Sequence, residues 1–343
     1  MARKNQSPSS SGATATAPPR AALDTAKYLR FYEQMVHIRE FEEHCNLAFR
    51  QGKVGGYLHL YSGEEAIAVG IIGALREDDV FLGHYRDHAY ALARGSDPGE
   101  VMAEICGKAT GCSKGKGGSM HICDASRNFY GGYGIVGGNV PIALGLGWAI
   151  KYRGGDQICV CFFGDGSMNQ GGFHETLNMC QLYKVPVLFV LENNGYAMGT
   201  SIERSHANPD LTERVASYNM KRERIDGQDV IGVHTRVSEI IAEMRRTHEP
   251  FFLECTTYRY YGHGAADNEP TQSTYRTKEE VERWRLRDPI VLLERVLGEH
   301  DALPAAERDR IHEEAKRAAD AALKFSDDSP FPAPDELLKD VYA

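Results

Sequence analysis

The 343-residue chain lacks several features that mark other classes of protein. No apolar run approaches the roughly twenty residues that a membrane-spanning helix needs, so a membrane protein is not expected. The formal net charge of −9 leaves no broad basic surface, so nucleic acid is not an expected partner. Lys114 and Lys116 are a local basic exception, expected in a solvated loop. The composition, 42% hydrophobic and 25% charged, is that of a globular protein with one or two domains.

The eight cysteines form no Cys-x-x-Cys pair, and several of them lie in apolar segments. Reduced cysteine behaves there as a small hydrophobic residue, so a reducing compartment is expected. Residues 1–20 contain no acidic residue and are rich in Ser, Ala, Thr and Pro, which predicts a disordered tail. No secretory apolar region is present, and a mitochondrial transit peptide would need more arginines and an amphipathic stripe. We therefore expect a cytoplasmic bacterial protein, with the mitochondrial matrix as the alternative.

The pattern of apolar residues predicts three structured regions. Residues 21–54 have the three-to-four spacing of a helical segment. Residues 55–276 alternate apolar runs, glycine turns and helical stretches, which predicts an α/β domain with a parallel sheet and helices on both faces. Residues 277–343 form a helical region, with charged amphipathic helices expected over residues 279–300 and 304–325.

A strand-helix-strand unit in the middle of the chain carries the most informative polar residues. The apolar run 158–163 is followed by Asp165 in a Gly-Asp-Gly turn, residues 171–183 have helical spacing, and the apolar run 187–191 is followed by Asn194. Strands joined by such a crossover run parallel and end at the same edge of the sheet, where open α/β folds bind ligands. We therefore expect Asp165 and Asn194 to converge.

The chemistry of these residues indicates a metal-bridged diphosphate. A carboxylate and a side-chain amide are the hard oxygen ligands that Mg²⁺ takes, completing its shell with phosphate oxygens and water. Gly166 and Ser167 are expected to open the following helix, where backbone N–H groups and the helix dipole favour an anion. An isolated Gly-Asp-Gly would be read as a surface turn, but here both flanking strands are present.

The stretch 164–199, GDGSMNQGGFHETLNMCQLYKVPVLFVLENNGYAMGT, resembles the thiamine diphosphate motif, a Gly-Asp-Gly followed about thirty residues later by Asn-Asn. Three further stretches, CSKGKGGSMHI (112–122), NFYGGYGIVGGNVP (128–141) and TYRYYGHGAAD (257–267), look like the alpha subunit of the decarboxylating component of 2-oxoacid dehydrogenase complexes. The likeness is strongest to the pyruvate dehydrogenase type and runs from about residue 25 to the C-terminus. It implies the thiamine diphosphate-binding fold and the oxidative decarboxylation of a 2-oxoacid.

The resemblance also implies which residues bind the cofactor and the metal. It gives Mg²⁺ the side chains of Asp165 and Asn194 and the main-chain oxygen of Tyr196. The implied contacts to the diphosphate are Tyr85, Arg86, Gly166, Ser167 and His263. The main chain at Gly134 and Val136 corresponds to contacts to the aminopyrimidine, and Met198 to an apolar residue under the thiazolium ring.

Two histidines match active-site positions of the family. His59, in YLHLYSGEEA, and His263, in YYGHG, resemble residues that contact the substrate, the reacting intermediate or the diphosphate. We assign His84, His88 and His121 to structural roles.

The resemblance implies partner chains. In this family a glutamate of a second, pyrimidine-binding domain activates the cofactor, and this chain has no second α/β domain of that kind. An α₂β₂ heterotetramer with a beta subunit is therefore expected, docked to a lipoyl-bearing dihydrolipoyl acyltransferase that accepts the acyl group.

Two departures from mitochondrial relatives bear on regulation. Those relatives carry a phosphorylated serine directly after the histidine that matches His263, whereas this chain has Gly264, which excludes kinase control there. Residues 268–273 make the following loop longer than expected, so its ordering over the cofactor does not follow from the resemblance. Ser201 and Ser273 lie near loops that are modified in related enzymes, and we expect them to be unmodified.

Other functions are weaker fits. Residues 132–137 match Gly-x-Gly-x-x-Gly and Asp156 follows at the distance of a ribose-binding acid, as in an NAD-dependent dehydrogenase, but no clear strand precedes Gly132 and Asp156 comes before a strand. The stretch from Gly111 lacks the Gly-Lys-Ser/Thr order of a nucleotide hydrolase. A non-catalytic subunit could lose Asp165 or Asn194, and both are present. Branched-chain 2-oxoacid and acetoin dehydrogenases share the metal motif and stay open as alternatives to pyruvate.

Overall fold

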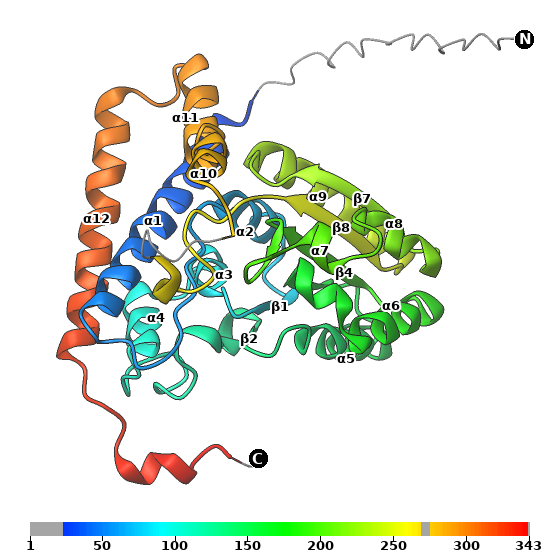
Figure 1. Cartoon of the computed structure of the whole chain (residues 1–343), viewed down its shortest axis with the longest axis horizontal. Coiled ribbons are helices and arrows are strands. Elements are labelled where there is room, and N and C mark those ends of the chain that lie inside the picture. Colours follow the sequence, from blue (N-terminus) through cyan, green and yellow to red (C-terminus); the bar gives the residue numbers. More distant parts are fainter. Residues whose placement is uncertain (1–22, 269–274, 342–343) are drawn as a thin grey trace, which may run out of the picture.

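The centre of the structure is a six-stranded sheet in which all neighbours run parallel (Figure 1). The computed structural model describes residues 23–268 and 275–341. The strand order is β2-β1-β3-β4-β8-β7. These strands are β1 (Val80–His84), β2 (Phe129–Tyr133), β3 (Cys159–Gly164), β4 (Val187–Asn193), β7 (Lys221–Asp226) and β8 (Phe251–Thr256). Because all six run the same way, the residues that follow them gather at one edge.

Successive residues of the central strand β3 enter two different cores, which shows that both faces of the sheet are covered. Cys159, Cys161 and Phe163 belong to one apolar cluster, whereas Val160 and Phe162 belong to the other. Side chains alternate between faces along a strand, so a strand that is apolar at every position needs a layer on each side. This arrangement confirms the predicted fold class.

Helices from different parts of the chain supply the two layers. The helices α5 (Asn139–Tyr152) and α6 (Gly171–Tyr183) pack together in the cluster that contains Cys159. The helices α2 (Glu65–Ile72) and α9 (Val230–Thr247) pack together in the cluster that contains Val160. The bounds of α6 coincide with the predicted helix over residues 171–183.

Two long terminal helices lie side by side at the edge of the molecule (Figure 1). The first is α1 (Thr25–Arg50), whose start is capped by Asp24 accepting a hydrogen bond from the Lys27 N–H. The second, α12 (Ala305–Asp328), also packs on α4 (Pro98–Ile105). The C-terminal helix α12 therefore packs against the N-terminal helix α1.

The predicted helix over residues 279–300 is wrong in one respect, because it is broken. The structure has α10 (Lys278–Arg285) and α11 (Pro289–Glu299). Pro289 has no N–H to continue α10, and Asp288 instead caps α11 by accepting a hydrogen bond from the Ile290 N–H. An Asp-Pro pair inside a helical pattern is therefore a helix start.

The remaining elements are short. They are the helices α3 (His88–Arg94), α7 (Ile202–Ser205) and α8 (Leu211–Val215), the hairpin strands β5 (Tyr196–Ala197) and β6 (Thr200–Ser201), and the 3₁₀ turns η1 (Gly118–Met120), η2 (Ala125–Arg127), η3 (Asp165–Asn169), η4 (Ala216–Tyr218), η5 (Ala265–Asn268) and η6 (Pro334–Leu338).

The structure tests two expectations drawn from the composition, those on membrane-spanning helices and on the cysteines. Within the described residues, no helix combines the length and apolarity needed to cross a membrane. All eight cysteines are free. The predicted disordered tail and Ser273 lie outside the described residues, and the division into regions at residues 54 and 276 stays a prediction.

Candidate cofactor and metal site

One cavity of about 570 Å³ lies beyond the carboxyl ends of β1, β3 and β4. In the sheet Gly164 pairs with Glu192, so the residues that follow β3 and β4 emerge next to each other. Every residue predicted to bind cofactor, metal or substrate lines this cavity: His59, Tyr85, Arg86, Gly134, Val136, Asp165, Gly166, Ser167, Asn194, Tyr196, Met198 and His263. The predicted convergence of Asp165 and Asn194 is thus present.

Asp165 follows β3 and is almost fully buried, with 2% of its surface exposed. Its Oδ2 atom has no hydrogen-bond partner among the described residues. Burial raises the pKa of this carboxyl to about 6. A buried carboxylate oxygen without a partner is costly unless a cation or donor meets it, so the residue fits a metal ligand.

The turn after Asp165 differs from the prediction. Gly166 and Ser167 lie in the 3₁₀ turn η3, and α6 begins later at Gly171. The two residues therefore do not open the helix, and their backbone groups belong to a separate tight turn. Ala197 lies against Gly166, since a Cβ there would sit 2.9 Å from the Ala197 Cβ.

A turn after β4 places the other predicted metal ligands. Gly195 has φ +84°, which lets the chain reverse between Asn194 and Tyr196. The Asn194 amide donates to Glu64 Oε1 at 3.2 Å, which leaves its Oδ1 oxygen facing other donors. Side-chain oxygen, main-chain oxygen and carboxylate are the donor set that Mg²⁺ accepts.

A guanidinium that the sequence reasoning missed already interacts with two of these oxygens. Arg259 Nη1 donates to Asn194 Oδ1 at 3.2 Å and to the Tyr196 carbonyl at 2.9 Å. Its Nη2 donates to the Met198 carbonyl at 2.6 Å and to the Tyr275 hydroxyl at 2.9 Å. A cationic group therefore stabilises the same oxygen cluster that is predicted to hold a cation.

The segment carrying Arg259 and His263 is held at its base by a second arginine. Arg276 Nη1 donates to the Arg259 carbonyl at 2.7 Å, and Nη2 donates to the carbonyls of Tyr260 and Tyr261. The side chain is 8% exposed, so these bonds are largely protected from water. The backbone leading to His263 is fixed by them.

Arg86, predicted to bind the diphosphate, is 2% exposed and lines the cavity. Its Nη1 donates to the Leu60 carbonyl at 2.6 Å and its Nη2 to the His263 carbonyl at 3.1 Å. A guanidinium has five N–H groups, so donors remain for an anion. The neighbouring Tyr85 ring lies 5.5 Å from the His263 ring between centroids.

His59 and His263 face each other, with ring centroids 5.0 Å apart. Burial and the positive charge of Arg86 lower the pKa of His59 to about 2 and that of His263 to about 3. Both rings are therefore neutral near pH 7, and each presents one N–H donor and one acceptor. His59 Nδ1 is buried without a partner among the described residues.

The structure argues against the nicotinamide alternative, although one of the reasons offered from the sequence is wrong. A strand, β2, does run through Gly132. Asp156, however, precedes β3 and forms a surface ion pair with Arg76 at 2.7 Å. A ribose-binding acid would lie at the carboxyl end of a strand, so Asp156 has no such role.

Comparison with known proteins identifies the family of the chain. The family model described as "Dehydrogenase E1 component" matches residues 33–335. This chain belongs to the E1 dehydrogenase family. The pyruvate dehydrogenase E1 alpha subunit of Rickettsia felis is 40% identical over 316 residues, which cover 92% of this chain and 96% of the relative.

Two further relatives share this extent. The pyruvate dehydrogenase E1 alpha subunit of Zymomonas mobilis is 42% identical over 327 residues, covering 94% of this chain and 91% of the relative. The alpha subunit of acetoin:2,6-dichlorophenolindophenol oxidoreductase from Bacillus subtilis is 42% identical over 323 residues, covering 94% and 95%. The resemblance found in the sequence is confirmed, and membership of the E1 family implies thiamine diphosphate and partner subunits of a larger complex.

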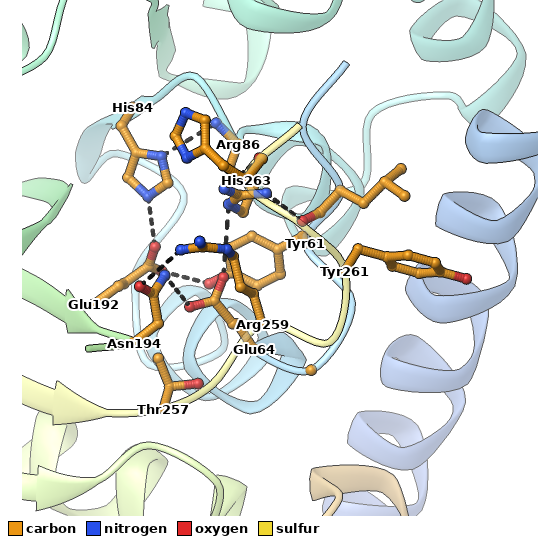
Figure 2. A network of polar contacts seen from close by, with 12 residues as sticks. Tyr61, Glu64, His84, Arg86, Glu192, Asn194, Thr257, Arg259, Tyr261 and His263 are labelled. Atoms are coloured by element: carbon orange, nitrogen blue, oxygen red, sulfur yellow. Dashed lines mark hydrogen bonds and ion pairs between the residues drawn. The ribbon is translucent and has the colours of Figure 1, made fainter. Parts of the chain in front are cut away.

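Beneath the cavity, this E1 chain contains a buried acidic network that the sequence reasoning did not find (Figure 2). Glu192 accepts hydrogen bonds from His84 Nε2 at 2.6 Å, from Tyr90 at 2.7 Å and from Tyr61. Burial and the Glu192 carboxylate raise the pKa of Glu64 to about 8. His84, assigned a structural role, also lines the cavity. A signal was available, because Glu192 is a charged residue at the end of an otherwise apolar strand.

Proposed function

We propose that this chain is the alpha subunit of an enzyme that oxidatively decarboxylates pyruvate and transfers the acetyl group to a lipoyl group of an acyltransferase. The observation that carries the proposal is the buried, unpartnered Asp165 oxygen in the cavity that also contains Asn194 and the Tyr196 main chain. Two of the relatives named above are pyruvate dehydrogenase subunits, which supports pyruvate as the substrate.

The chain's own residues have defined tasks in this proposal. Asp165, Asn194 and the Tyr196 carbonyl would hold Mg²⁺, and Arg86 with the Gly166 turn would hold the diphosphate. Thiamine diphosphate, when bound, supplies the carbon nucleophile and electron sink for the loss of CO₂. The neutral His59 and His263 would orient the substrate by hydrogen bonds, since neither carries a charge near pH 7.

A beta subunit in an α₂β₂ assembly would complete the site. The apolar surface at the mouth of the cavity supports the presence of this subunit. Tyr57 and Met198 both line the cavity, and they are 71% and 64% exposed. Ile135, beside the cavity residue Val136, is 78% exposed. Exposed apolar groups gathered at a ligand site are typical of a surface that another chain covers. The compartment stays a prediction, cytoplasmic in a bacterium.

The test is an assay of the chain alone and co-expressed with its beta subunit, with Mg²⁺ and thiamine diphosphate. We expect no decarboxylation by the chain alone, and with the partner a kcat/KM for pyruvate at least about tenfold above that for branched-chain 2-oxoacids, a difference of roughly 1.4 kcal/mol in transition-state binding. Full-rate decarboxylation by the isolated chain would refute the need for a partner. A preference for acetoin would favour the second candidate, for which the Bacillus subtilis relative is the evidence.

A further inference from the structure

A glycine-rich loop away from the metal residues encloses a carboxylate of the chain itself. Residues 111–118, which we name the Glu104 loop, surround the side chain of Glu104 near the end of α4. Glu104 Oε2 accepts the N–H groups of Ser113 and Gly115, both at 2.8 Å. Glu104 Oε1 accepts those of Gly117 at 2.7 Å and Gly118 at 3.2 Å. Glu104 is fully buried.

The backbone of the loop requires its glycines. A Cβ at Gly111 would lie 2.3 Å from Glu104 Oε2, and one at Gly115 would lie 2.6 Å from the Gly107 carbonyl carbon. Gly115 has φ +74° and Gly118 has φ +64°. Successive N–H groups in such a turn form a concave site for an anion, as in phosphate-binding loops. Here the anion is Glu104.

The lysines of the loop do not neutralise this carboxylate, because they point outward. Lys114 and Lys116 form ion pairs with Asp340, at 2.8 and 2.9 Å, in the C-terminal segment. Both lysines are exposed, so the expectation of a solvated lysine loop is confirmed, although each lysine also pairs with Asp340. Glu104 is balanced by four backbone N–H groups, and these four donors are therefore not available to an external phosphate.

The residues that directly follow the Glu104 loop form part of the wall of the cofactor cavity. Met120 lines the cavity, and the preceding Ser119 is held by a 2.9 Å hydrogen bond to His88. His121 Nδ1 lies 3.1 Å from the Gly132 carbonyl. A Cβ at Gly134 would lie 3.1 Å from His121 Nε2, so the ring backs the segment predicted to contact the aminopyrimidine.

We propose that Glu104 is a positioning residue for the cofactor, because its carboxylate serves as a built-in anion that shapes the Glu104 loop and so places Met120 and His121. The part of this inference that concerns the cofactor rests on the proposed function. The part that concerns the loop does not, since it predicts a property of the protein without ligand.

The first measurement is hydrogen exchange of residues 111–121 in the full chain, without cofactor. In Glu104→Ala, exchange of these amides should rise about tenfold or more, because four N–H groups lose their acceptors. Glu104→Gln keeps the shape of the side chain but replaces one acceptor oxygen by a donor. It should also raise the exchange of these amides, and it serves as the test variant if Glu104→Ala does not fold. Glu100→Ala is the matched control, an exposed carboxylate on the same helix, and should leave exchange unchanged. Unchanged exchange in both folded Glu104 variants would overturn the inference.

The second measurement asks whether the lost group acts as an anion. Formate should restore protection of residues 111–121 in Glu104→Ala, because it fits the vacated space and accepts N–H groups. Formamide, neutral and of similar size, should not restore it. Equal rescue by formamide would mean that Glu104 only fills space, and would overturn the inference.

The third measurement is a titration of the co-expressed complex with thiamine diphosphate and Mg²⁺. We expect about 10- to 100-fold weaker binding in Glu104→Gln than in wild type, as for other outer-shell partners of a ligand site, and recovery in Glu104→Ala with formate. Normal affinity in a variant whose loop has opened would overturn the positioning role. If the wild-type complex bound no thiamine diphosphate, the proposed function would fail, and the exchange and formate results would still decide the role of Glu104 in the loop.

Discussion

The turn at residues 164–167 and the Glu104 loop both combine glycines with charged residues, but they differ in what meets their polar groups. In the first, a buried Asp165 oxygen has no partner among the described residues. In the second, both oxygens of a buried carboxylate are saturated by the loop itself. A glycine-rich turn thus shows that backbone groups converge, but whether the ligand is external depends on what the neighbouring elements place there.

The largest effect is expected from Asp165→Ala. Removing the only carboxylate among the predicted metal ligands should weaken Mg²⁺-dependent binding of thiamine diphosphate by more than about 100-fold. Calorimetric titration measures the loss, and circular dichroism should show the same fold. Asp156→Ala, which removes an exposed carboxylate before β3, should bind normally. Unaltered Mg²⁺-dependent binding by Asp165→Ala would remove the metal assignment, and with it the contrast between the two turns.

The next effect is on stability, through the backbone of the Glu104 loop. Gly115→Ala places a Cβ at φ +74° and 2.6 Å from the Gly107 carbonyl carbon, so it should lower the free energy of unfolding by about 1–3 kcal/mol. Gly145→Ala in α5 meets no atom within 4 Å and should instead raise it by up to about 1 kcal/mol. Denaturant titration compares the two. Equal changes in the free energy of unfolding for the two variants would mean that the backbone of the loop is not constrained around Glu104.

The third effect depends on pH and arises at Asp87, which accepts the Ile122 N–H at 2.9 Å just beyond the loop. Burial raises the pKa of Asp87 to about 8, against about 3.9 for an unfolded aspartate. Between these values the folded protein keeps a proton that the unfolded chain has released. The contribution is therefore full below about pH 4 and falls as pH rises to about 8, by up to about 1.4 kcal/mol per pH unit.

Asp87→Asn removes this titration, so wild type should lose stability relative to the variant as pH rises through that window. Glu42 and His88 lie beside Asp87 and are retained in both proteins, so the difference between the two reports the removal of the Asp87 carboxyl. Thermal unfolding from pH 5 to 8.5 makes the comparison. A constant difference in stability across this range would show that Asp87 is ionised throughout.

The smallest effect is expected from Lys114→Ala. The ion pair of Lys114 with Asp340 is exposed on both sides, 56% and 57% for the side chains, so water and salt screen it. Thermal unfolding should show no resolvable shift. A clear loss of stability that disappears at high salt would mean that the outer face of the Glu104 loop contributes as much as its buried carboxylate.

Elements and contacts formed by residues close in sequence were predictable. Contacts between residues that only the fold brings together were not. The bounds of α6 and the place of Asp165 and Asn194 follow from the apolar runs β3 and β4 and the crossover between them. The helix break at Asp288 could have been found, since an aspartate before proline is a common start of a helix.

The missed residues act at long range. Arg259 meets Asn194 across 65 positions, and His84 meets Glu192 across 108. The sequence pattern around each of them is ordinary, and only the three-dimensional packing gives them partners. The Glu104 loop was missed although its acceptor lies only 9 to 14 positions before the donors. Its glycines were visible, but nothing in the sequence shows that a residue of the preceding helix accepts their N–H groups.

The arginine beneath the His263 segment has a consequence for how the chain tolerates change in length. Arg276 donates hydrogen bonds to the carbonyls of Arg259, Tyr260 and Tyr261. These bonds join the two ends of the segment that runs from Tyr261 to Arg276. His263 follows Tyr261 by two positions, so these bonds hold the backbone next to it whatever the length of chain that leads on to Arg276. A change in that length costs only a small closure entropy. The histidine therefore keeps its place when the number of residues between it and Arg276 varies.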